Sequence, residues 1–164
     1  MKENMILGQF LPSLIKDKNL LKAFNEIDRE KYLPDGLKHL AYSEINIKVD
    51  DNRYLISPYC LAKIIEKSDI NTKDVVLLVG SGYGYESAII SKISSAVMAL
   101  EENINFHKQA EINIKNNLID NVVNINGQLF KGCEKFSPYD IIIFLGSTNK
   151  VNEALLNQLS NNGK

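Results

Sequence analysis

The sequence has little of what marks several large classes of protein. Its 164 residues contain only two cysteines, Cys60 and Cys133, which lie far apart and form no CxxC pair, so neither a disulfide framework nor a zinc knuckle is predicted. Apolar runs near the start are short and are broken by Pro12 and Lys16, too short for a signal-peptide core or a membrane span. We therefore expect a cytoplasmic protein with no membrane partner.

The charge balance and the missing motifs remove further classes. Lys and Arg total 19 against 20 Asp and Glu, a formal charge of −1, and the basic residues are spread along the chain. Because a phosphate backbone is bound by a basic face, no nucleic-acid partner is expected. The chain has no HExxH, no serine-centred elbow and no Walker lysine, so neither a metal site nor a hydrolase is predicted.

What the chain does have is an apolar run that ends in alternating glycines. Residues 75–79, Val-Val-Leu-Leu-Val, predict a strand buried on both faces. Gly80, Gly82 and Gly84 follow, and without Cβ atoms they can adopt φ > 0 and let a ligand lie against the backbone. Tyr85 stands where a dinucleotide-binding turn has its third glycine, which favours an adenosine ligand other than NAD or FAD. A glycine-rich turn without a ligand is the alternative.

Helices and strands alternate regularly from this point on. We predict strands over 75–79, 96–100, 122–125 and 140–145, and helices over 86–93, 104–118 and 152–159. This alternation is typical of an α/β fold with a parallel sheet. Upstream, Asp17 caps a helix that ends near residue 28, Ser57-Pro58 begins another that runs to about residue 67, and 45–49 is a short edge strand.

The ends of the second and third predicted strands carry candidate ligand residues. Glu101 closes the second strand, 21 residues after Gly80, where adjacent parallel strands place a carboxylate within reach of both ribose hydroxyls of an adenosine. A solvated carboxylate is the alternative reading, and Glu102 is a weaker rival for the same role. After the third strand, Asn126-Gly127 places an amide near the adenine edge or forms a simple Asn-Gly turn.

The last predicted strand raises a question of assembly. Residues 141–145, Ile-Ile-Ile-Phe-Leu, have the composition of a central strand, yet no later strand is predicted to cover the other edge. An uncovered apolar edge invites pairing with a second chain, so self-association through 140–145 is expected. The helix after it should turn Leu155, Leu156 and Leu159 inward.

Several short pieces of the chain resemble, in their order, protein-L-isoaspartate O-methyltransferases. They span nearly the whole chain and comprise 24–34, Ala41-Tyr42-Ser43-Glu44, Ile56-Ser57-Pro58-Tyr59, 79–85, Leu100-Glu101, Asn126-Gly127 and Pro138-Tyr139-Asp140. The resemblance implies a Rossmann-like class I methyltransferase, a three-layer sandwich with a mainly parallel sheet and an N-terminal helical and irregular extension. It also implies S-adenosyl-L-methionine as cofactor, and methylation of the free carboxylate of isoaspartyl residues in damaged proteins.

The same resemblance assigns roles to individual residues. It places Gly80, Ser81, Gly82 and Gly84 around the methionine portion of the cofactor, Glu101 on the ribose, and Asn126 and Gly127 beside the adenine. Ser57 and Arg53 would face the substrate. Ser57 is also a good N-cap, and Arg53 is also an ordinary surface cation, so both alternatives stay open. The target carboxylate is already ionised at neutral pH, so the reaction needs alignment and exclusion of water rather than a strong base.

Departures from the family pattern leave a second hypothesis open. The substrate loop lacks the usual threonine, Ser57 directly precedes Pro58, Leu78 replaces an acidic residue, and Asn126 replaces an aspartate. The resemblance further implies more strands beyond Lys164. A non-catalytic or divergent paralogue acting as an interaction module is therefore the alternative. We expect one domain, with residues 1–57 as a substrate-side extension and 58–164 as the cofactor-binding core.

Overall fold

The computed structural model describes residues 2–164, whose internal contacts form two compact units. The first ends at Asp69 and the second is Ile70–Lys164, so the helix that begins at Pro58 belongs to the N-terminal unit rather than to the predicted core. That the two units make one domain stays a prediction. No helix among residues 2–164 is both long and apolar enough to cross a membrane.

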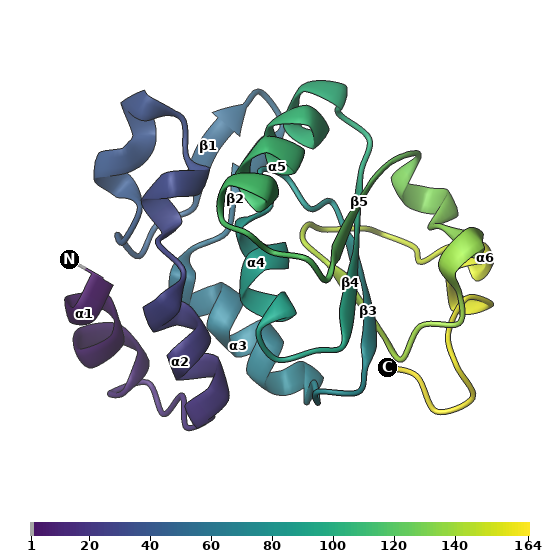
Figure 1. Ribbon diagram of the computed structural model, residues 1–164, viewed down its shortest axis with the longest axis horizontal. Coiled ribbons are helices and arrows are strands. Elements are labelled where there is room, and N and C mark those ends of the chain that lie inside the picture. The colour runs from purple at the N-terminus through teal and green to yellow at the C-terminus, as the bar shows by residue number, and fades with distance from the viewer. Residues whose placement is uncertain (1) are drawn as a thin grey trace. The chain divides into compact units, whose positions relative to one another are not determined.

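Short helices and one hairpin make up the N-terminal unit (Figure 1). The sequence predicts α2 correctly, because the Asp17 carboxylate accepts hydrogen bonds from the amides of Asn19 and Leu20 at 2.8 and 3.1 Å. Helix α2 buries Phe24, whose ring packs edge-on against that of Phe10 with centroids 4.8 Å apart. In chain order the elements are α1 (Lys2–Met5), the π-helix η1 (Ile6–Phe10), α2 (Lys18–Glu26), the 3-10 helices η2 (Arg29–Tyr32) and η3 (Asp35–Leu40), β1 (Ile47–Asp50), β2 (Arg53–Leu55) and α3 (Pro58–Ser68).

The stability of this unit depends on pH through the carboxyl group of Asp28. Lys2 Nζ lies 2.6 Å and Lys31 Nζ 3.0 Å from its carboxylate, and these hydrogen bonds, that of Lys2 first, hold the pKa of Asp28 below its usual value against the opposing effect of burial. A carboxyl with a lowered folded-state pKa stabilises the fold above its unfolded pKa, and that stability is lost as pH falls through the folded pKa. We expect the melting temperature of the wild type to fall more than that of Asp28→Asn between roughly pH 5 and pH 3. Equal falls in the two proteins would contradict this role.

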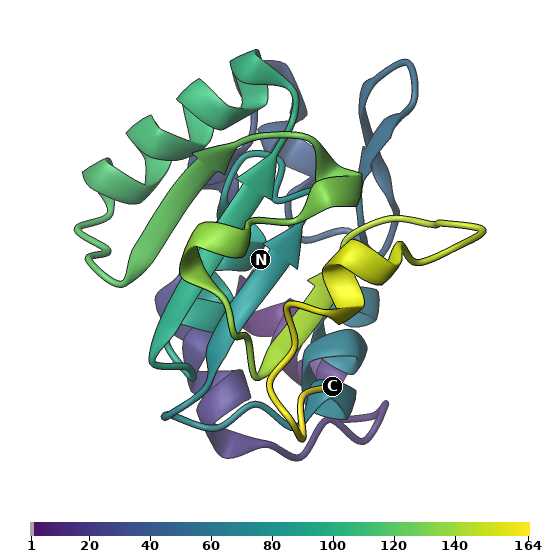
Figure 2. The same cartoon turned by 90° about the vertical axis from the view of Figure 1, so that its right-hand side faces the viewer.

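The C-terminal unit is built on a four-stranded parallel sheet. Its strands are β3 (Val75–Val79), β4 (Ala96–Glu101), β5 (Val122–Asn126) and β6 (Ile141–Phe144), in the spatial order β5-β4-β3-β6 (Figure 2). Pairing is in register, with Val79 opposite Leu100 and Glu101 opposite Asn126. The carboxyl ends of β3, β4 and β5 therefore lie at one edge of the sheet, as the sequence predicts.

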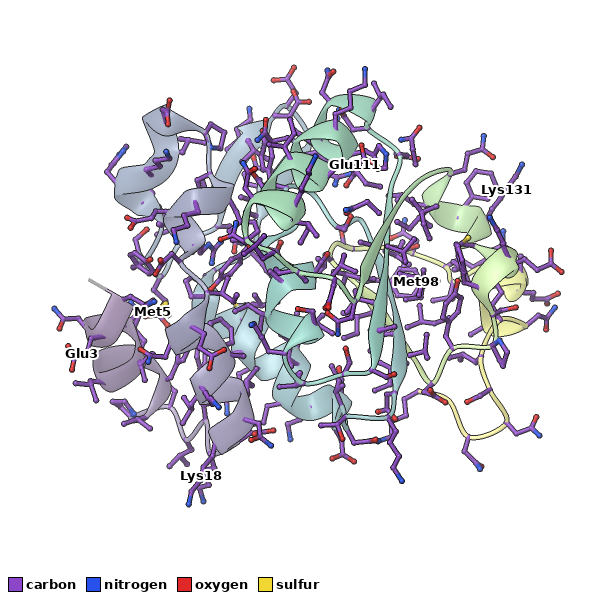
Figure 3. The ribbon with its side chains drawn as sticks, in the orientation of Figure 1. Glu3, Met5, Lys18, Met98, Glu111 and Lys131 are labelled. Atoms are coloured by element: carbon purple, nitrogen blue, oxygen red, sulfur yellow. The ribbon has the colours of Figure 1, made fainter. Side chains whose placement is uncertain are left out.

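Helices cover both faces of this sheet, which confirms the predicted α/β layering. Helices α4 (Tyr85–Ser91) and α5 (Ile104–Asn116) lie on one face (Figure 1). The other face is covered by three short helices, η4 (Leu129–Lys131), η5 (Glu134–Phe136) and α6 (Glu153–Leu156). Met98, labelled in Figure 3, points toward the second group and belongs to an apolar cluster there. That cluster also contains Leu77, Tyr139 and Leu155.

The predicted final helix begins as expected, because Asn152 caps it and Leu155 is buried, but it is shorter than predicted. Helix α6 ends at Leu156, which is 51% exposed, and the next side chain to be buried is the polar Gln158. Gln158 is satisfied by its neighbours: its Nε2 donates to the carbonyls of Lys131 and Ala154 at 2.7 and 2.9 Å, and its Oε1 accepts from the amide of Cys133 at 2.8 Å. These three hydrogen bonds allow a polar side chain to be buried in this segment, where Leu156 and Leu159 were predicted to face inward.

The outer edge of β6 is also less open than predicted. The C-terminal segment runs beside it, with the amide of Tyr139 donating to the carbonyl of Gln158 at 2.8 Å and that of Ile142 donating to the carbonyl of Lys164 at 2.9 Å (Figure 2). The amide of Lys164 in turn donates to the carbonyl of Asp140. The chain itself thus pairs with the first half of this edge, so the prediction of a wholly uncovered edge is wrong.

Candidate functional site

The loop after β3 has the backbone that its glycines predict. Gly80, Gly82 and Gly84 have φ values of 83°, 56° and 89°, a region that side chains with a Cβ rarely adopt. The amides of Gly80 and Ser81 both donate to the carbonyl of Leu100, at 2.9 and 3.1 Å, which fixes the loop to the end of β4. The loop therefore has a defined conformation.

Helix α5 supports the other side of the loop. A Cβ added at Gly84 would lie 3.3 Å from the Cβ of Ala110, a tight contact, and the φ of 89° disfavours any residue with a Cβ at this position. Asn113 Nδ2 donates to the carbonyl of Tyr83 at 3.0 Å, and the Tyr83 ring packs against that of Phe106 with centroids 4.8 Å apart. Asn113 was not among the residues predicted from the sequence. Its only signal was a polar residue on the buried side of a predicted helix.

Glu101 is fully buried, and its carboxylate holds the loop in place. Its Oε2 accepts a hydrogen bond from the amide of Gly82 at 2.9 Å, and its Oε1 accepts one from the amide of Asn103 at 2.9 Å. An ionised carboxylate is an acceptor with about four lone-pair positions on its two oxygens, which suits it to bind several donors at once. Glu102 is exposed, so the structure brings Glu101 rather than its rival against the glycine loop.

Asn126 and Gly127 join the ends of β4 and β5. Asn126 Nδ2 donates to the carbonyls of Glu101 and Glu102 at 2.9 and 3.3 Å, and the amide of Gly127 donates to the carbonyl of Glu101 at 3.2 Å. Since both partners of the side chain are carbonyl oxygens, only its amide nitrogen can face them, which leaves Oδ1 as the remaining acceptor of Asn126. Gly82, Glu101 and Asn126 therefore meet at the carboxyl ends of the strands.

Replacing Asn126 by aspartate tests this bridge. The carboxylate of Asn126→Asp would face two carbonyl oxygens and lose both hydrogen bonds, even though the aspartate restores the residue expected from the family pattern. We expect the affinity for S-adenosylhomocysteine, measured by calorimetric titration, to fall roughly fivefold, the equivalent of about 1 kcal/mol. Asn116→Asp, at an exposed position at the end of α5, is the control, and unchanged or tighter binding by Asn126→Asp would contradict the bridge.

Ser81 provides an unused polar group within the loop. Its hydroxyl is buried and has no hydrogen-bond partner among residues 2–164. Buried hydroxyls without partners are rare, because desolvation without a hydrogen bond costs about 1–3 kcal/mol. With the three left-handed glycines and the Glu101 carboxylate, Ser81 makes this loop fit a ligand that carries polar groups along its length.

Ser57 and Arg53 lie in the N-terminal unit. Ser57 Oγ accepts a hydrogen bond from the amide of Cys60 at 3.3 Å, so Ser57 is the N-cap of α3, and its side chain is 4% exposed. The hydroxyl hydrogen is not used by this cap and can still be donated. Arg53 begins β2 opposite Asp50 and is half-buried. The cap interpretation of Ser57 is thus confirmed, whereas the roles of both residues toward a substrate stay predictions.

Comparison with known proteins decides the family. The model of the protein-L-isoaspartate(D-aspartate) O-methyltransferase family matches residues 2–164. The chain belongs to this family. Protein-L-isoaspartate O-methyltransferases of Aliivibrio fischeri and Helicobacter pylori are 32% and 33% identical to it over 159 and 142 residues. The matches cover 96% and 87% of this chain, and 76% and 68% of the relatives.

Solved structures of the family agree with the fold. One protein-L-isoaspartate O-methyltransferase superimposes with a TM-score of 0.86 at 27% identity, over 99% of this chain and 53% of its own. A second, from Plasmodium falciparum, was solved in complex with S-adenosyl-L-homocysteine and gives a TM-score of 0.84 at 19% identity. The predicted family and the predicted Rossmann-like methyltransferase fold are both confirmed.

Proposed function

We propose that this chain is an S-adenosyl-L-methionine-dependent methyltransferase that methylates the free carboxylate of isoaspartyl residues in proteins. Membership of the isoaspartyl methyltransferase family is the single observation that carries the proposal. The relatives compared above are named as enzymes, so the alternative of a non-catalytic interaction module is not favoured. The missing nucleophile and base are consistent with this activity, because the acceptor is already an anion at neutral pH.

The polar groups of the glycine loop fit this cofactor. Gly80, Gly82 and Gly84 let its methionine portion lie on the backbone, the unpartnered Ser81 hydroxyl faces its polar groups, and the Glu101 oxygens accept from the ribose hydroxyls. Asn126 Oδ1 accepts from the adenine amino group, with Gly127 beside it. When bound, S-adenosylmethionine supplies an electrophilic methyl group on a sulfonium.

The acceptor is bound by residues of the N-terminal unit. The Ser57 hydroxyl donates to one oxygen of the isoaspartyl carboxylate and Arg53 attracts its charge, because hydrogen bonds between a guanidinium and a carboxylate are strong and directional. These two residues orient the acceptor carboxylate, and orientation of the reacting groups is the main task of the protein in such a transfer. Neither residue needs to remove a proton.

We propose that the chain acts in the cytoplasm. Both cysteines, Cys60 and Cys133, are free thiols, as is usual in a reducing compartment. Self-association through the part of the β6 edge near Phe144 remains part of the proposal. The proposal is limited to that part because the C-terminal segment already pairs with Tyr139, Asp140 and Ile142 at the other end of the edge.

Two measurements on the same purified chain test the proposal. Calorimetric titration with S-adenosylhomocysteine should show one site per chain, and labelled methyl from S-adenosylmethionine should appear on an isoaspartyl peptide. Glu101→Ser and Glu102→Ser provide a matched pair of variants for the site. Only Glu101→Ser should lose both cofactor binding and methyl transfer. Binding without transfer in the wild type would overturn the activity and leave only a cofactor-binding paralogue.

A further inference from the structure

A single peptide group in the N-terminal unit is held from both sides. Arg29 Nη2 donates to the carbonyl oxygen of Ile56 at 2.6 Å, and Asn46 Oδ1 accepts a hydrogen bond from the amide of Ser57 at 2.9 Å. The carbonyl of Ile56 and the amide of Ser57 are the two polar ends of one planar peptide unit. Its orientation is therefore fixed by two side chains from separate parts of the chain.

This peptide group sets the direction of the Ser57 side chain. Ser57 has φ −60° and ψ 151°, and Pro58 after it disfavours a helical conformation at Ser57. With the peptide plane before Ser57 fixed by Arg29 and Asn46, and with Oγ bonded to the amide of Cys60, little freedom remains at this residue. The serine that directly precedes Pro58 is thus held rigidly.

Arg29, which donates to the carbonyl of Ile56, is itself held firmly in place. Arg29 opens the 3-10 helix η2 and is buried, and a hydrogen bond from a guanidinium is stronger than one between neutral groups. The Tyr42 phenol lies close to η2, whose backbone at Glu30 and Arg29 acts to lower the pKa of the phenol. Burial first, and then the charges of Glu30 and Asp28, raise the pKa of Tyr42 to about 12, so this phenol stays neutral.

We propose that Arg29 and Asn46 are positioning residues for the methyl acceptor, acting by clamping the Ile56–Ser57 peptide group. This inference rests on the proposed function, in which Ser57 contacts the isoaspartyl carboxylate. The clamp keeps the Ser57 hydroxyl in the orientation that donates to that carboxylate, and it compensates for the altered substrate loop by fixing the backbone. Loss of the clamp weakens acceptor binding and alignment while the cofactor site, built from other residues, is unaffected.

Asn46 is the position at which the clamp can be opened. Its side chain is exposed, whereas Arg29 is buried and its removal would also disturb the core. We expect Asn46→Ala to raise the KM for an isoaspartyl peptide or lower kcat so that kcat/KM falls roughly tenfold. The affinity for S-adenosylhomocysteine should stay unchanged, the melting temperature should fall by only about 2–6 °C for the lost hydrogen bond, and the amide of Ser57 should exchange its hydrogen faster.

Two variants complete the test. Asn46→Asp keeps an acceptor for the Ser57 amide, so it should restore the exchange protection and most of kcat/KM at about 0.3 M salt, where its added charge is screened. Asn25→Ala, at an exposed position of α2, should behave as the wild type. Wild-type kcat/KM in Asn46→Ala, or unchanged exchange of the Ser57 amide, would overturn the clamp alone. A wild-type chain that transfers no methyl group would overturn the proposed function with it.

Discussion

Replacing Glu101 by glutamine is expected to remove nearly all binding of S-adenosylhomocysteine. Both oxygens of the buried Glu101 carboxylate accept hydrogen bonds from backbone amides, those of Gly82 and Asn103. In Glu101→Gln the side-chain NH₂ group must face one of these amide donors, so the loop shifts and the ribose hydroxyls lose a charged acceptor. Charged hydrogen bonds contribute about 1.5–3 kcal/mol each, so two such losses predict an affinity lower by roughly 100-fold or more.

The neighbouring residue provides the control for this substitution. Glu102→Gln removes the same charge one position later, but from an exposed side chain, so it should bind S-adenosylhomocysteine as the wild type does. Calorimetric titration measures both affinities, and circular dichroism checks that both variants are folded. Similar affinities in the two variants would show that Glu101 has no contact with the cofactor and that the site lies elsewhere.

Gly132→Ala is expected to lower the stability of the fold more than the addition of a methyl group at any other glycine of the C-terminal unit. Gly132 has φ 66° and ψ −150°, a region open almost only to glycine. A Cβ there would clash with Gln158 Oε1 and would lie 2.7 Å from Leu155 Cδ2. Because Gln158 makes three hydrogen bonds with this region, its displacement adds to the strain. We expect a loss of about 2–4 kcal/mol, which lowers the melting temperature by roughly 5–15 °C.

A second glycine and a double variant test the cause of this loss. A Cβ at Gly146 would meet nothing within 4 Å, so Gly146→Ala should leave the melting temperature within about 2 °C of the wild type. If the clash with Gln158 is responsible, Gly132→Ala combined with Gln158→Ala should lose less stability than the two single changes added together. Full additivity would assign the loss to backbone strain at Gly132 instead.

Local patterns predicted the parts of the fold that depend on local physics. Residues 75–79 form β3 as predicted, because a continuous apolar run can be buried only in the middle of a covered sheet. The starts of α2 and α3 were predicted from Asp17 and Ser57-Pro58, because a helix cap bonds to amides only two or three residues further along the chain. The last helix failed because the burial of Gln158 depends on carbonyl and amide groups about 25 residues away, which no periodic pattern records.

The candidate site divides in the same way. Parallel topology alone brings the loop after β3 beside the end of β4, so the glycines and Glu101 could be predicted from their spacing. Asn113 could not, since its hydrogen bond to Tyr83 joins residues 30 apart. The clamp on the Ile56–Ser57 peptide joins residues 27 and 11 apart and likewise has no local signature.

Recognition of the isoaspartyl carboxylate by this chain is tested most directly by one measurement. Two peptides of identical sequence, one with isoaspartate and one with ordinary aspartate at the same position, are incubated with the chain and labelled S-adenosylmethionine, and the methyl groups transferred are counted. We expect transfer to the isoaspartyl peptide, approaching one methyl group per peptide, and none above background to its aspartyl isomer. Equal labelling of both peptides, or of neither, would contradict the claim.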